Sequence, residues 1–109
     1  MNVGTFANYD VLEFYRSLPF NYRGSLKDDI DAVCKRTPKY LYPGLPEILG
    51  PSVSVIDVGC GPGWLSNSIN FIYHSKVLGI DFNPVAIDRA KDVAKALNLK
   101  AEFLVCDLF

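Results

Sequence analysis

Residues 53–66 read VSVIDVGCGPGWLS, and this stretch decides the fold. The apolar run 53–58 is rich in β-branched residues and predicts a short, buried β-strand. Glycines then occupy every second position, at Gly59, Gly61 and Gly63. Glycine permits unusual backbone dihedral angles and the close approach of a ligand. The pattern therefore predicts a ligand-binding loop between this strand and the helix that follows it.

A regular alternation of helix and strand follows the loop. We expect a helix over Trp64–Tyr73, a strand over 76–80, a helix beginning at Asn83-Pro84 and ending near Asn98, and a third strand over 101–106. Asn83 is a good N-cap, proline suits the first helical position, and Asn98 suits a left-handed helix stop. Strands separated by helices are parallel and joined by crossovers. The expected fold is a partial, Rossmann-like, doubly wound α/β sheet with spatial strand order 3-2-1.

The first fifty residues have a different, helical and aromatic character. A helix is expected over 9–18, where Pro19 closes it, and a second from the N-cap Ser25 to about residue 34. The proline-rich stretch 37–51 reads as irregular, with one helical turn near 46–49. We therefore divide the chain into an N-terminal helical cap segment, 1–50, and the first half of a ligand-binding domain, 51–109, truncated after its third strand.

Composition excludes several classes of protein. Eleven Lys and Arg balance twelve Asp and Glu, so no nucleic-acid partner is expected. No apolar run is long enough for a membrane span and no signal peptide is apparent, so a cytoplasmic protein is expected. The three cysteines form no CxxC pair, and His74 has no ligand-spaced neighbour, so neither a disulfide framework nor a metal site is expected.

The spacing of the glycines argues against a dinucleotide site. A dinucleotide-binding loop follows the pattern GxGxxG, which from Gly59 and Gly61 requires a third glycine at position 64. Trp64 occupies that position, and its indole would stand where close packing is required.

Three motifs together carry a family resemblance. The stretch 57–63 within VIDVGCGPGWLS, the stretch 77–91 (VLGIDFNPVAIDRAK) and the stretch 101–109 (AEFLVCDLF) resemble, in order and spacing, the first three motifs of class I S-adenosylmethionine-dependent methyltransferases. The resemblance implies S-adenosylmethionine as cofactor and covers about residues 53–109. The catalytic residues of that family follow later strands, so none is identified in this sequence.

The resemblance also implies a set of cofactor-binding residues. The loop, from Gly59 through Cys60 and Gly61 to Gly63, would pass under the methionyl and ribose parts, and Asp57 would orient the loop and the methionyl ammonium. Asp81 would accept hydrogen bonds from both ribose hydroxyls, as the two side-by-side oxygens of a carboxylate allow. Phe82 would pack on the adenine, Asp107 would accept from its amino group, and Leu108 would line the ring.

Each of these residues also has a structural reading. Asp57 would cap the loop, Phe82 would belong to the core, Asp107 would start a turn, and Asp81 would be an anion at a helix N-terminus. Upstream, Tyr22 or Arg23 reaching the cofactor carboxylate is a further hypothesis, because the fork of a guanidinium matches a carboxylate.

The expected function is methyl transfer to an acceptor that the sequence does not identify, with a small molecule favoured over nucleic acid. The chain itself would be an inactive, cofactor-binding fragment of a longer enzyme. We expect either self-association through the free edge of its first strand or coverage of that edge by the N-terminal segment. Three alternatives stay open: a non-catalytic module that binds S-adenosylmethionine, a nicotinamide-dependent dehydrogenase, and a polyamine synthase that uses decarboxylated cofactor.

Overall fold

The computed structural model describes residues 25–107. The elements are α2 (Leu26–Lys35), the 3-10 turn η1 (Pro38–Tyr40), α3 (Leu45–Ile48), β1 (Ser54–Val58), α4 (Trp64–Tyr73), β2 (Lys76–Asp81), α5 (Pro84–Ala96) and β3 (Glu102–Val105). The alternation of strand and helix predicted after residue 53 is confirmed. The 3-10 turn forms where an irregular stretch was expected. The helix predicted over 9–18, together with Tyr22, Arg23 and Leu108, lies outside the described residues.

The three strands form one parallel sheet in which β2 lies between β1 and β3. Counted from β3 the order is 3-2-1, as predicted. The register places Val58 beside Ile80, and Asp81 beside Val105. The carboxyl ends of the strands therefore meet at one edge of the sheet, which is where ligands bind in folds of this kind.

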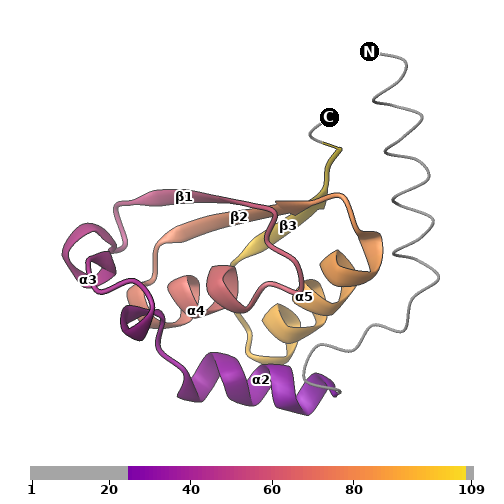
Figure 1. Ribbon diagram of the computed structural model, residues 1–109, viewed down its shortest axis with the longest axis horizontal. Helices are drawn as coiled ribbons and strands as arrows, with labels where there is room; N and C mark the ends of the chain where they lie inside the picture. Colours follow the sequence, from indigo (N-terminus) through magenta and orange to yellow (C-terminus); the bar gives the residue numbers. More distant parts are fainter. Residues whose placement is uncertain (1–24, 108–109) are drawn as a thin grey trace.

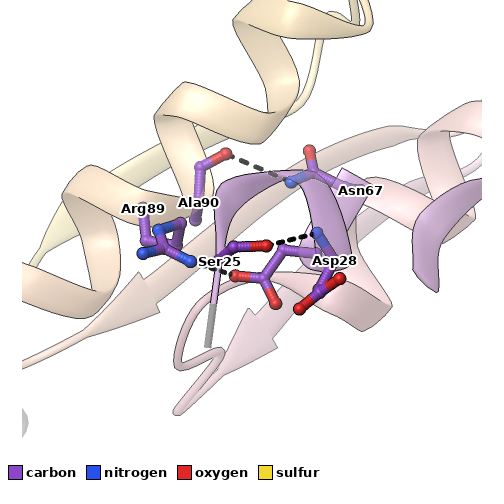
Figure 2. Close-up of polar contacts among 6 residues, drawn as sticks. Ser25, Asp28, Asn67, Arg89 and Ala90 are labelled. Carbon is purple, nitrogen blue, oxygen red and sulfur yellow. Dashed lines mark hydrogen bonds and ion pairs between the residues drawn. The ribbon is translucent and has the colours of Figure 1, made fainter. Parts of the chain in front are cut away.

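Side-chain caps start two of the helices where the sequence predicted them. The Ser25 hydroxyl accepts a hydrogen bond from the Asp28 amide at 3.1 Å, which begins α2 (Figure 2). The Asn83 Oδ1 accepts from the amides of Val85 and Ala86 at 3.0 and 3.4 Å, which begins α5. Each cap satisfies amides that have no partner inside the helix.

Polar contacts also fix the opposite, amino-terminal edge of the sheet. Residues in the left-handed conformation follow α4 and α5, at His74 (φ 60°) and Asn98 (φ 54°). The Asn70 side chain donates to the Ser75 carbonyl and accepts from the Lys100 amide, both at 2.9 Å. One side chain of α4 therefore holds the turns that lead into β2 and β3.

Helices cover one face of the sheet in two layers (Figure 1). Helices α4 and α5 pack against the strands, and α2 packs across the outer side of both helices. Arg89 of α5 binds the Asp29 carboxylate of α2 at 2.7 Å, and the Trp64 indole donates to the Ala32 carbonyl at 3.2 Å. Because Asp29 is buried, this ion pair is shielded from solvent and fixes where α2 sits.

The opposite face of the sheet has no helix on it within residues 25–107. Ile56, Val58 and Leu104 are 65, 62 and 54% exposed there. The prediction of a buried first strand is therefore wrong for Ile56 and Val58. Successive residues of a strand point to opposite faces, and the helices cover only the face that carries Val55 and Asp57.

One edge of β1 has no neighbouring strand within residues 25–107, and such an edge can pair with another copy of the chain. In the described part of the chain β1 pairs only with β2. Association of copies through that edge stays a prediction.

No helix within residues 25–107 combines the length and the apolar character needed to cross a membrane.

Close packing around Phe103 joins the sheet to the helices and to the glycine loop. Its ring is buried in a cluster with Ile87, Ala90 and Ala94 of α5. A Cβ at Gly79 would lie 2.7 Å from the Phe103 Cδ1, and a Cβ at Gly63 would lie 2.6 Å from the Ala90 Cβ. Both distances are too short for a side chain at either position. Because glycine has no side chain, β3 and α5 can pack closely against the loop.

We predict that Gly79→Ala destabilises the protein by about 1–3 kcal/mol, because the added methyl group overpacks a filled core. Gly44→Ala is the control, since Gly44 has φ −79° and no atom within 4 Å of the added Cβ. We expect its effect to stay within about 0.5 kcal/mol. Urea unfolding measures both free energies, and equal losses for the two variants would contradict the packing described here.

Candidate functional site

The glycine loop leaves β1 and turns back over the end of β2. Gly59, Gly61 and Gly63 have φ of 71°, 57° and 83°, in the left-handed region that favours glycine. The amides of Gly59 and Cys60 both donate to the Ile80 carbonyl, at 2.8 and 2.9 Å. The backbone of the loop is thus tied directly to the strand next to it.

The Asp81 carboxylate joins the loop to the start of α5. Its Oδ2 accepts from the Gly61 amide at 2.8 Å, and its Oδ1 accepts from the Asn83 amide at 2.9 Å. The residue is 8% exposed. A carboxylate has about four acceptor positions, so each oxygen keeps the capacity to accept a further hydrogen bond.

A cleft of about 390 Å³ lies between the loop, the end of β2 and the first turn of α5. It is lined by Gly59, Cys60, Gly61, Pro62, Asp81, Phe82, Asn83 and Ala86. The volume is in the range of small-molecule sites. This lining includes no Lys, Arg or His, so the charge that it contributes is the negative charge of Asp81.

Most of the predicted site residues come together in this cleft. The predicted residues that line it are Gly59, Cys60, Gly61, Asp81 and Phe82. Sequence reasoning missed Pro62, Asn83 and Ala86. All three stand inside the quoted motifs, and Ala86 also lies on the first turn after the Asn83 cap, so their positions in the sequence could have identified them. Cofactor binding by any of these residues stays a prediction.

Three further predicted residues, Asp57, Gly63 and Asp107, do not line the cleft. Gly63 is buried behind the loop, where it allows the close approach of Ala90. Asp107 is exposed, just beyond β3, and does not line the cleft. Leu108 lies outside the described residues.

Asp57 lies at the end of β1 and is bound by the first turn of α4. The Ser66 hydroxyl donates to its Oδ2 at 2.6 Å, and Ser66 is fully buried. The contact has the short length of a hydrogen bond from a hydroxyl to a carboxylate.

The Cys60 thiol reports on the electrostatics of the site. Burial, followed by repulsion from the Asp57 and Asp81 carboxylates, raises the pKa of Cys60 from 9.0 to about 12. The thiol therefore stays protonated at neutral pH. The two carboxylates that oppose a negative charge at this position favour a positive one.

The residues described form no cluster of three or more His, Cys, Asp or Glu side chains that could hold a metal ion.

Comparison with known proteins places the second part of the chain in a family. A family model described as "Methyltransferase domain" matches residues 49–109, more than half of the chain. The ribosomal protein L11 methyltransferase of Thermosipho africanus (strain TCF52B) is 35% identical over 65 residues. That alignment covers 60% of this chain and 25% of the relative, so the chain corresponds to about a quarter of the relative's length.

Solved structures show the same fold. The PH0226 protein of Pyrococcus horikoshii OT3 matches with a TM-score of 0.57 and 27% identity, over 87% of this chain and 42% of that one. The geranyl diphosphate C-methyltransferase of Streptomyces coelicolor A3(2), solved with Mg²⁺, geranyl diphosphate and S-adenosyl-L-homocysteine, matches with a TM-score of 0.63 and 16% identity. The latter match covers 92% of this chain and 46% of the enzyme.

We predict that Cys60 reacts with iodoacetamide at pH 8 on the order of 30-fold more slowly than an ordinary exposed thiol. A pKa three units higher lowers the thiolate fraction about 1000-fold, and the greater nucleophilicity of the more basic thiolate recovers part of this. Cys34 is exposed and provides the internal comparison. Peptide mass spectrometry follows both sites, and equal alkylation rates would contradict the described environment of Cys60.

Proposed function

The chain belongs to the methyltransferase domain family, and on this premise we propose that its cleft binds S-adenosylmethionine as the donor in methyl transfer. One observation carries the proposal. The glycine loop and the Asp81 carboxylate converge on a single cleft at the carboxyl edge of a parallel sheet. This is the edge at which nucleoside-containing ligands bind in doubly wound folds.

The shape of the loop fits such a ligand. No atom lies within 4 Å of where a Cβ would stand on Gly59 or Gly61, so their backbone borders open space. Gly59, Cys60 and Gly61 would lie under the methionyl and ribose parts of the cofactor. Phe82, which lines the same cleft, would pack against the adenine.

The chemistry of Asp81 fits the ribose. Both of its oxygens accept backbone amides and keep acceptor capacity, so they can take two neighbouring hydroxyls while the loop stays anchored. The spacing of the loop, with Trp64 where a dinucleotide-binding loop needs its third glycine, favours S-adenosylmethionine over a dinucleotide.

The charge of the site fits the reactive part of the cofactor. Bound S-adenosylmethionine would supply a methyl group activated by its positive sulfonium for in-line transfer to the acceptor. Burial is the main cause of the raised pKa of Cys60, and repulsion from Asp57 and Asp81 adds to it, so the two carboxylates give the loop a negative potential. The contribution of these residues is to bind and orient the cofactor, which lowers the entropic part of the barrier.

The acceptor and the wider organisation are also proposals. We favour a small-molecule acceptor, because the balanced charge of the sequence gives no electrostatic reason for nucleic acid. We propose that residues 1–50 form a helical cap and 51–109 the cofactor-binding part. The start of the family match at residue 49 supports this boundary. A cytoplasmic location is the corresponding expectation.

We predict that Asp81→Asn weakens the binding of S-adenosylhomocysteine by about tenfold or more, since one carboxylate oxygen is replaced by a donor that faces a backbone amide. Asp88→Asn, an exposed change on α5, is the matched control and should bind like the wild type. Isothermal titration calorimetry measures both, with NAD as a parallel ligand. Binding of NAD without S-adenosylhomocysteine, or equal affinities for the two variants, would refute the proposed site.

A further inference from the structure

We propose that Ser66 is a positioning residue for the cofactor site. Its hydroxyl holds one oxygen of the Asp57 carboxylate and leaves the other available to the amino group of the methionyl part of the ligand. The inference rests on the proposed function and extends it to a residue that the sequence motifs do not single out. It also gives the ligand class that Ser66 would favour, namely adenosine sulfides that carry the amino acid moiety.

The hydrogen bond between these side chains is specific. The Ser66 Oγ lies 2.6 Å from the Asp57 Oδ2, and Ser66 is fully buried. In the described part of the chain no other residue bonds to the Asp57 carboxylate, so its Oδ1 keeps its full acceptor capacity. Asp57 does not itself line the cleft, but it is only partly buried where β1 passes into the loop. A carboxylate at that place is suited to a cationic group that extends from the cleft.

The neighbours of Asp57 on the sheet do not fix its side-chain rotamer. The residue beside it on β2 is Gly79, which has no side chain, and Phe103 follows in the same row on β3. The Phe103 ring and the Cys60 thiol lie over Gly79. No side chain of the adjacent strand therefore stands beside Asp57 to fix its rotamer, and that task is left to Ser66 of α4.

The contact between Ser66 and Asp57 also places a negative charge at the start of α4. The N-cap of the helix is Gly63, which has no capping side chain, and the first turn contains no acidic residue. Asp57, bound through the third helical residue, places a negative charge at this N-terminus, where the helix dipole favours it. The same contact thus stabilises the helix and orients the carboxylate, and an experiment has to separate these two effects.

Ser68 provides the control variant. It lies one half-turn further along α4 and is as buried as Ser66, but its Oγ has no hydrogen-bond partner among the residues described. Ser68→Ala therefore removes a buried hydroxyl from the same helix without removing a bond to Asp57. Ser66→Thr keeps the hydroxyl and tests for rescue.

A first measurement needs no ligand. The Hα–Hβ coupling constants of Asp57, measured by NMR, should report one side-chain rotamer in the wild type, Ser66→Thr and Ser68→Ala. In Ser66→Ala they should become averaged, because the hydrogen bond that residues 25–107 make to the carboxylate is lost. An Asp57 side chain that keeps a single rotamer in Ser66→Ala would overturn the inference.

The second measurement compares two ligands by calorimetry. We expect Ser66→Ala to weaken S-adenosylhomocysteine about tenfold, the loss expected for a hydrogen bond to a charged group. The affinity for 5′-methylthioadenosine, which lacks the amino acid moiety, should change less than about twofold. Adding Ser66→Ala to Asp57→Asn should not lower the affinity for S-adenosylhomocysteine any further, because the two side chains act through one contact.

The outcomes separate the two proposals. If the wild type bound neither compound, the proposed function would fail, and this inference with it. If the wild type bound both and Ser66→Ala weakened both equally, the function would stand, but Ser66 would be a structural residue only.

Discussion

The bond between the Asp81 carboxylate and the Gly61 amide is the contact on which the candidate site depends. It connects the middle of a loop that needs positive φ angles to the rigid end of the central strand. With its second oxygen, Asp81 holds the Asn83 amide, so the loop and the start of α5 are positioned by one side chain. Because all the ends of parallel strands meet at this edge, a single buried carboxylate organises a cleft from elements separated in sequence.

The second constraint is steric. Gly63 and Gly79 lie where the Phe103 ring and α5 leave no room for a side chain. Helix α5 therefore comes close enough to the loop for its first turn to become a wall of the cleft. The glycines have two different roles. Gly59 and Gly61 border open space and allow the shape of the loop. Gly63 and Gly79 allow the close packing behind it.

Local signals made much of the fold predictable from the sequence. Asn83-Pro84, Ser25 and Asn98 act within three or four residues of themselves, so their roles as caps and stops were correctly predicted. The convergence of Asp81, Gly59 and Gly61 on one cleft was predictable, because their spacing matches a recurrent motif at strand ends, and cofactor binding by these residues stays a prediction.

Contacts over long sequence distances could not be predicted in this way. Nothing near Asp29 indicates that Arg89 binds it, and the polarity of Ser66 gives no sign that it points at Asp57. The exposure of Ile56 depends on what covers the second face of the sheet, which an apolar run in a strand does not specify. The raised pKa of Cys60 depends likewise on the fold around it.

The central claim is that a nucleoside ligand shares the Asp81 carboxylate with the loop. The most direct test is an NMR titration of the ¹⁵N-labelled chain with S-adenosylhomocysteine. The account predicts that the amides of Gly61 and Asn83, which both donate to Asp81, show shift changes among the largest in the spectrum, while amides of α2 such as Val33 stay unchanged. Saturable binding that leaves both Asp81-bound amides unperturbed would contradict it.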